Sequence, residues 1–143
     1  MARCCLRSLR SEIFERSRQW LSSVTFYCLY ENNGTYTEDV VTSSGAIRVD
    51  ISGKLFAYVS PTDLGKVYLG LKFFEAPAST GYDSRLGTLV HEIMHLWITG
   101  NTNRTSAEVY PKAECLILAR TNPVGAQNNA QNYEYFVEDW LMR

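Results

Sequence analysis

The sequence predicts an α+β domain in which a small sheet packs against an amphipathic helix and further helices follow. Short β-branched and aromatic stretches fill the first half of the chain, and a strong helical pattern occupies residues 84–98. Two more helical patterns complete the chain. Because the chain has 143 residues, we expect one domain over residues 1–143 and leave open whether its N-terminal part is truncated.

Composition and charge are those of a globular protein without a strong electrostatic field. Hydrophobic residues make up 45% and charged residues 20%, with 14 Lys and Arg against 15 Asp and Glu. This balance predicts no nucleic-acid partner and no membrane attachment, and no apolar run approaches the roughly 20 residues of a membrane span. The basic first residues are not followed by an apolar stretch, so no secretory signal is visible. A monomer is expected.

The first half of the chain is expected to contribute one amphipathic helix and four strands. The turn at Ser52-Gly53 predicts that the second and third strands form a hairpin. The polar, turn-rich stretch before that hairpin is expected to be a loop. In chain order these are a helix over 8–21, a strand over 24–30, a loop over 31–44, strands over 46–51 and 54–59, and a strand over 66–74.

The second half is expected to be helical. Apolar residues recur at steps of three and four in the helix over 84–98, which Asp83 or Ser84 begins and Gly100 ends. A further helix begins near Pro111, runs to about residue 120, and ends at Asn122. The closing helix carries an apolar stripe whose aromatic residues we assign to the core; the stripe is Tyr133, Phe136, Val137, Trp140 and Leu141.

Both histidines of the chain lie in one His-Glu-x-x-His motif within the helix over 84–98. Residues four apart share a helix face, so His91 and His95 can present two imidazoles to one ion. Imidazole nitrogen suits Zn²⁺, and Glu92 is placed to hold and deprotonate an attacking water. The alternative is a chance match on an ordinary amphipathic helix. The good helical pattern and the absence of other histidines favour the zinc site.

A catalytic zinc site needs a third protein ligand, and no third histidine exists. Glu108 lies in the loop after the helix, whereas Glu114 lies on the next helix, with eighteen residues between it and His95. The second spacing is typical of zincins of the thermolysin and aminopeptidase type. The other downstream carboxylates, which are expected to be solvated, are Glu134, Glu138 and Asp139. The four cysteines are too scattered for a Cys-x-x-Cys zinc site, and a Cys28–Cys115 bridge is left open.

Four stretches together resemble the aspzincins, the deuterolysin and peptidyl-lysine metalloendopeptidase family, which are typically secreted and typically fungal. They are KVYLGLKFF at 66–74, LGTLVHEIMH at 86–95, YPKAECLILA at 110–119 and NAQNYEYF at 129–136. The resemblance implies a zincin-like metalloprotease fold, one zinc ion per chain, Glu92 as general base, and Tyr110 as the tyrosine that stabilises the transition state. It also implies a peptide or protein substrate and an extracellular location.

The chain departs from the family pattern in the loop that supplies the third ligand. The family places an Asp there, three residues before the tyrosine, but that position is Ala107. The nearest carboxylate is Glu108, which we therefore assign as the third ligand by default. Gly70 stands where relatives often carry a cysteine, which leaves Cys115 without its usual mate, and Gln131 replaces a common Asp.

The sequence therefore predicts a zinc-dependent endopeptidase with metal ligands His91, His95 and Glu108 and catalytic residues Glu92 and Tyr110. Two alternatives remain. The atypical loop is compatible with an inactive homologue that acts as a binding protein. The helix spacing is compatible with a zincin that uses Glu114 as its third ligand.

Overall fold

The structure, a computed structural model, describes residues 23–29, 37–42, 45–50, 52–60, 65–98 and 108–143. The helix expected over residues 8–21 and the helix end expected at Gly100 lie outside these residues. No helix among the described residues is long and apolar enough to cross a membrane.

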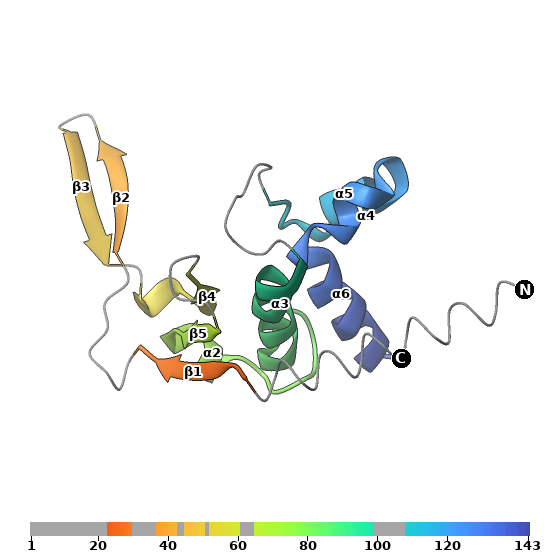
Figure 1. Cartoon of the computed structure of the whole chain (residues 1–143), viewed down its shortest axis with the longest axis horizontal. Helices are drawn as coiled ribbons and strands as arrows, with labels where there is room; N and C mark the ends of the chain where they lie inside the picture. The colour runs from red at the N-terminus through yellow and green to blue at the C-terminus, as the bar shows by residue number, and fades with distance from the viewer. Residues whose placement is uncertain (1–22, 30–36, 43–44, 51, 61–64, 99–107) are drawn as a thin grey trace, which may run out of the picture.

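The central sheet has three strands in the order β1-β5-β4. The middle strand, β5 (Lys66–Leu69), runs parallel to β1 (Thr25–Cys28) and antiparallel to β4 (Ala57–Val59). Figure 1 shows α3 (Arg85–Ile98) lying between this sheet and α6 (Ala130–Leu141). The predicted α+β fold, with the sheet packed on the His-Glu-x-x-His helix, is confirmed.

The register of the sheet separates an apolar face from an aromatic one. Val67 pairs with Val59, and Leu69 pairs with Ala57, so these side chains share the face that packs on Leu96 of α3. Val67 has no exposed surface and lies in the core. The opposite face carries a stack of rings, in which the centroid of Tyr68 lies 5.5 Å from that of Tyr27 and 4.8 Å from that of Tyr58.

A second, two-stranded sheet corrects two expectations. β2 (Thr37–Thr42) pairs antiparallel with β3 (Gly45–Asp50), so part of the stretch over 31–44 is a strand and not a loop. The expected hairpin between 46–51 and 54–59 is wrong, because β3 pairs with the strand before it and Ser52–Lys54 forms a 3₁₀ turn. The two adjacent acidic residues of β2 gave this stretch a polar pattern, so its β-branched residues were not recognised as a strand. Figure 1 shows that the β2–β3 hairpin lies apart from the three-stranded sheet.

The strand expected over 66–74 is also partly wrong, since it ends at Leu69 and is followed by α2 (Leu71–Glu75). A short, continuously apolar run does not distinguish strand from helix by its pattern. Gly70 marks the change, because a Cβ there would lie 2.2 Å from the carbonyl oxygen of Leu55. The close approach of two backbones requires glycine at this position, and a cysteine would not fit here.

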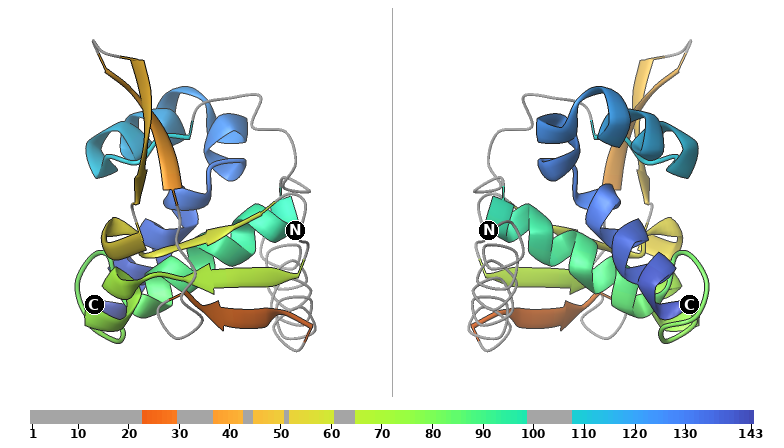
Figure 2. Two further views of the ribbon diagram at one scale, coloured as in Figure 1. Left: turned by 90° about the vertical axis from the view of Figure 1, so that its left-hand side faces the viewer. Right: turned by 90° about the vertical axis from the view of Figure 1, so that its right-hand side faces the viewer.

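The helices that follow α3 complete the described part of the fold, and Figure 2 shows this part of the chain in two views. α4 (Lys112–Thr121) follows Pro111 as predicted, whereas α5 (Pro123–Gln127) was not predicted. The Oδ1 atom of Asn122 accepts a hydrogen bond from Gly125 N and so begins α5 directly after the residue that ends α4. α6 lies along α3, and the loop before α6 returns the chain towards α4.

The orientation of α6 is the reverse of the expected one. Its buried residues are Ala130, Gln131, Glu134 and Glu138. In the expected stripe, Phe136, Trp140 and Leu141 are exposed, and Tyr133 and Val137 are half-buried. Phe136 is 64% exposed and Trp140 is 60% exposed, so the assignment of these aromatic residues to the core is wrong. The expectation that Glu134 and Glu138 are solvated is wrong as well. Cys28 and Cys115 are both free thiols, so the bridge that was left open is not formed.

Candidate metal centre

Three potential metal ligands converge between α3 and the segment that precedes α4. His91, His95 and Glu108 each offer a ligand atom, and these atoms all lie within 4.8 Å of one another. Both histidines are buried, with exposed fractions of 7% and 8%. Among the residues that the structure describes, these three form the group with metal-ligand chemistry. Glu114 is exposed on α4 and does not belong to the group.

The spacing of the donor atoms fits a tetrahedral ion. The Nε2 atoms of His91 and His95 lie 3.0 Å apart. The Oε1 atom of Glu108 lies 3.4 Å from Nε2 of His91, and its Oε2 atom lies 3.2 Å from Nε2 of His95. Ligands about 2.0–2.1 Å from a tetrahedral zinc ion are separated by roughly 3.3 Å, so the two imidazole nitrogens and the carboxylate oxygen nearest to each lie close to the spacing that such an ion needs.

The chemistry of this donor set also fits zinc. Two imidazoles and one carboxylate are borderline-soft nitrogen and hard oxygen ligands, as in catalytic zinc sites with one open position. Burial would raise the pKa of Glu108, but the hydrogen bond from His95 and the charges of both histidines lower that pKa to about 2. The carboxylate is therefore ionised at neutral pH and available to a cation.

Glu134 of α6 lies behind the first histidine. Its Oε2 atom is 3.1 Å from Nδ1 of His91, which is ion-pair distance, although the geometry is not aligned for a hydrogen bond. Burial would lower the pKa of His91, but the contact with Glu134 and the charges of Glu92 and Glu108 outweigh it and raise that pKa. A carboxylate this close to Nδ1 favours the proton on that nitrogen, which leaves the lone pair of Nε2 available to an ion.

Glu92 follows the first ligand on α3 and is 6% exposed. Burial raises the pKa of Glu92, opposed by the charges of His91 and His95. A buried carboxylate whose pKa is raised binds a proton more readily than one in water, as a group that takes up and releases a proton requires.

Tyr110 lies over the same group of residues. Its hydroxyl donates a hydrogen bond of 2.8 Å to Glu108 Oε2, and its ring stacks on His91 with centroids 6.0 Å apart. The ring is 49% exposed, so the hydroxyl is at the edge of the site and not beneath it. The backbone oxygen of Tyr110 accepts a hydrogen bond of 2.9 Å from Tyr135 Oη. The backbone of Tyr110 is therefore held by Tyr135, and its phenol hydroxyl is hydrogen-bonded to the candidate ligand Glu108.

The structure thus brings together all five of the residues that sequence reasoning singled out, namely His91, Glu92, His95, Glu108 and Tyr110. Sequence reasoning missed Glu134, which it assigned to a solvated face. A signal was present, because Gln131, Glu134 and Glu138 recur at steps of three and four. This spacing places the three residues on one helix face, which the pattern alone does not distinguish from a solvated face; in the structure that face packs on the ligand helix α3.

The chain is similar to several known proteins. The family model of the aspzincins, described as lysine-specific metallo-endopeptidase, matches residues 15–138. An extracellular protease of Aeromonas hydrophila is 37% identical over 129 residues, covering 87% of this chain and 36% of that protein. A peptidyl-Lys metalloendopeptidase of Pleurotus ostreatus is 37% identical over 123 residues, covering 86% of this chain and 59% of that protein.

A solved structure shares the fold. The zinc peptidase from Grifola frondosa superposes with a TM-score of 0.53 at 36% sequence identity, covering 82% of this chain and 58% of that one. The chain therefore spans between about a third and three fifths of the length of these relatives.

Proposed function

Because the chain belongs to the aspzincin family of metallo-endopeptidases, we propose that it hydrolyses peptide bonds with one zinc ion held by His91, His95 and Glu108. The observation that carries the proposal is the donor spacing of 3.0 to 3.4 Å among these three residues, which matches a tetrahedral ion with an open position. Glu108 takes the place that the family gives to Asp, and its longer side chain reaches the two histidines from the neighbouring position.

A zinc ion held by these residues would act as a Lewis acid and would lower the pKa of a water molecule bound to it to about 7. Glu92 accepts the proton of the attacking water and passes it to the leaving amine. Its raised pKa, caused by burial, suits a group that must take a proton and return it. Tyr110 donates its hydroxyl proton in a hydrogen bond to the oxyanion that forms on the peptide carbonyl. In the structure the Tyr110 hydroxyl donates to Glu108, so this hydrogen bond must break before the hydroxyl can donate to the oxyanion.

The sheet offers a place for the substrate backbone. Within the described part of the chain, β4 pairs with β5 on one side and forms the edge of the three-stranded sheet next to α3. An extended peptide pairs with such an edge through main-chain hydrogen bonds. The relatives named for cleavage at peptidyl-lysine make lysine peptides the first substrates to test.

The extracellular relative supports secretion, so the purified protein should be assayed under extracellular ionic conditions. Elemental analysis after dialysis should give about one zinc per chain. Casein and lysine-containing peptides should be cleaved, and a chelator should stop cleavage until zinc is restored. A protein that takes up no zinc would overturn the proposal. A protein that binds zinc but cleaves neither substrate would support the second candidate, an inactive homologue that acts as a binding protein, which the atypical ligand loop favours.

A further inference from the structure

Asn129, the residue that precedes α6, contacts the segment that carries Glu108 and Tyr110. Its side chain is 5% exposed. Its Oδ1 atom accepts a hydrogen bond of 3.0 Å from Val109 N, and its Nδ2 atom donates one of 2.9 Å to Val109 O. One amide thus holds both backbone groups of a single residue that is 20 positions away.

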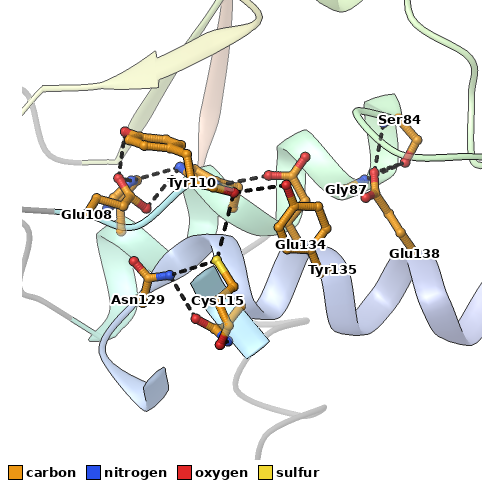
Figure 3. A network of polar contacts seen from close by, with 12 residues as sticks. Ser84, Gly87, Glu108, Tyr110, Cys115, Asn129, Glu134, Tyr135 and Glu138 are labelled. Carbon is orange, nitrogen blue, oxygen red and sulfur yellow. Dashed lines mark hydrogen bonds and ion pairs between the residues drawn. The ribbon is translucent and has the colours of Figure 1, made fainter. Parts of the chain in front are cut away.

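Val109 is the residue between the third ligand and the tyrosine. Holding both the N–H and the C=O of Val109 fixes the orientation of the two peptide planes that flank it. The direction in which the Glu108 side chain leaves the backbone is fixed as a result. Figure 3 shows Asn129 beside this segment, with Tyr135 of α6 close to Tyr110. The ligand segment is consequently held from the α6 side, by the same helix that places Glu134 behind His91.

The chemistry of the contact requires an amide. Val109 presents a donor and an acceptor side by side, and only Asn or Gln offers a complementary pair in one planar group. Aspartate of the same shape would accept from Val109 N but would place a second oxygen against Val109 O. The amide is in turn fixed by Asn132, whose Oδ1 accepts from Asn129 Nδ2 at 2.8 Å, and by the buried thiol of Cys115 at 3.6 Å.

We infer that Asn129 is a positioning residue that holds the Glu108 carboxylate at the metal site through the backbone of Val109. This rests on the proposed function, because it assumes that Glu108 is a ligand. A side chain that orients a ligand without touching the ion typically changes metal affinity by about 10- to 100-fold. The expected effect of Asn129→Ala is a loss of zinc affinity in that range in protein that remains folded.

The test is a double-mutant cycle on zinc affinity, measured by chelator competition for the wild type, Glu108→Ala, Asn129→Ala and the double variant. If Asn129 acts through Glu108, Asn129→Ala weakens zinc binding in the wild-type background and has little further effect once Glu108 is gone. An equal loss in both backgrounds would overturn the inference. If Glu108→Ala itself leaves zinc affinity unchanged, the proposed metal site fails first. If Glu108→Ala weakens binding and Asn129→Ala does not, only the present inference fails.

The matched control is Asn122→Ala. Asn122 also accepts a backbone hydrogen bond, from Gly125 N, but it does so at the start of α5 on the exposed surface. It should lower stability slightly and leave zinc affinity unchanged. A cobalt-substituted protein adds a spectroscopic readout, since a displaced carboxylate alters the visible bands of the ion in Asn129→Ala but not in Asn122→Ala.

Asn129→Asp and hydrogen exchange address the case in which Asn129→Ala does not fold. The isosteric Asn129→Asp should weaken zinc binding like the alanine variant, because it loses the donor to Val109 O. In the metal-free wild type, the amide of Val109 should exchange slowly, since Asn129 Oδ1 accepts from it without any ion. Rapid exchange at Val109 in that protein would overturn the inference without any substitution.

Discussion

The carboxylate of Glu138 accepts two hydrogen bonds from Ser84, one from the backbone N at 2.8 Å and one from Oγ at 2.9 Å (Figure 3). Both residues are fully buried. Ser84 begins α3, so the carboxyl group of Glu138 lies at the N-terminal, positive end of that helix. Four residues earlier on α6, Glu134 meets His91 at 3.1 Å. Two carboxylates one turn apart thus fix α6 to α3, at the start of the ligand helix and at its first ligand.

Replacing Glu138 with alanine should destabilise the fold. The change leaves the N–H and hydroxyl of Ser84 buried without an acceptor, which costs about 2 kcal/mol, and it opens a cavity between the helices. Glu138→Gln keeps an acceptor for both bonds and should be close to neutral. Urea denaturation of the metal-free proteins measures the difference, with the exposed Glu114→Ala as a control. Equal stability of Glu138→Ala and the wild type would show that this contact contributes nothing.

The same carboxyl group predicts a pH dependence. Burial raises the pKa of Glu138 above its usual value of 4.5. The folded protein therefore binds this proton more readily than the unfolded chain, so its contribution to stability is fully present below about 4.5 and is lost as pH rises through the folded pKa. Glu138→Gln cannot lose that proton. The free energy of unfolding of the wild type, measured relative to Glu138→Gln, should decrease from acidic to neutral pH, and a difference that is constant or increases would contradict this.

Gly87 should not tolerate a side chain while Glu138 is present. A Cβ at Gly87 would lie 2.2 Å from Glu138 Oε1 and 2.7 Å from its Cδ. Gly87→Ala should therefore destabilise by about 2 kcal/mol, as overpacking does, although alanine is the better helix former by about 1 kcal/mol. In the Glu138→Ala background the clash disappears, and the same substitution should be neutral or stabilising. Melting temperatures of the wild type, Gly87→Ala, Glu138→Ala and the double variant measure the coupling between the two positions. Additive effects of the two substitutions would exclude this contact as the cause of the destabilisation.

The parts of the fold that sequence reasoning predicted are those in which burial follows apolar periodicity. The ligand helix α3 shows this in part, because Leu89 of the expected stripe packs against the sheet core and Met94 is buried, although Leu86 of the same stripe is 37% exposed. The strand expected over 24–30 is present as β1, and the residues that flank it, Val24 and Leu29, are buried. At these positions local propensity and tertiary burial act in the same direction, so the sequence pattern is sufficient.

The predictions failed where tertiary contacts override the pattern. On α6 the buried side is polar, because Glu134 and Glu138 find partners on α3 that compensate for their burial, and Phe136 and Trp140 are left on the other side. Periodicity identifies two faces of a helix but not which face is buried when ionised groups have partners. The same limit explains why Asn129 was noticed only as part of a motif: its contact with Val109 joins segments that no local pattern connects.

Glu92 should be required for hydrolysis but not for metal binding. It is buried next to His91 and has the raised pKa of a group that exchanges protons, yet it is not among the three converging ligands. Glu92→Gln should keep about one zinc per chain and lose at least about 100-fold in kcat, the usual scale of acid–base assistance. Zinc content and casein hydrolysis of the same sample measure both. Cleavage by Glu92→Gln at the wild-type rate would assign the proton transfer to another group.

The choice between Glu108 and Glu114 as third ligand can be tested by parallel substitutions. Glu108 lies 3.2 Å from His95 Nε2 and has a pKa lowered to about 2, whereas Glu114 is exposed on α4. Glu108→Ala should weaken zinc binding by orders of magnitude, because two imidazoles alone hold the ion poorly. Glu114→Ala should bind zinc like the wild type. Chelator competition on both variants decides the question. Loss of affinity only in Glu114→Ala would move the third ligand to α4, and loss in neither would leave the two histidines with water as the remaining ligand.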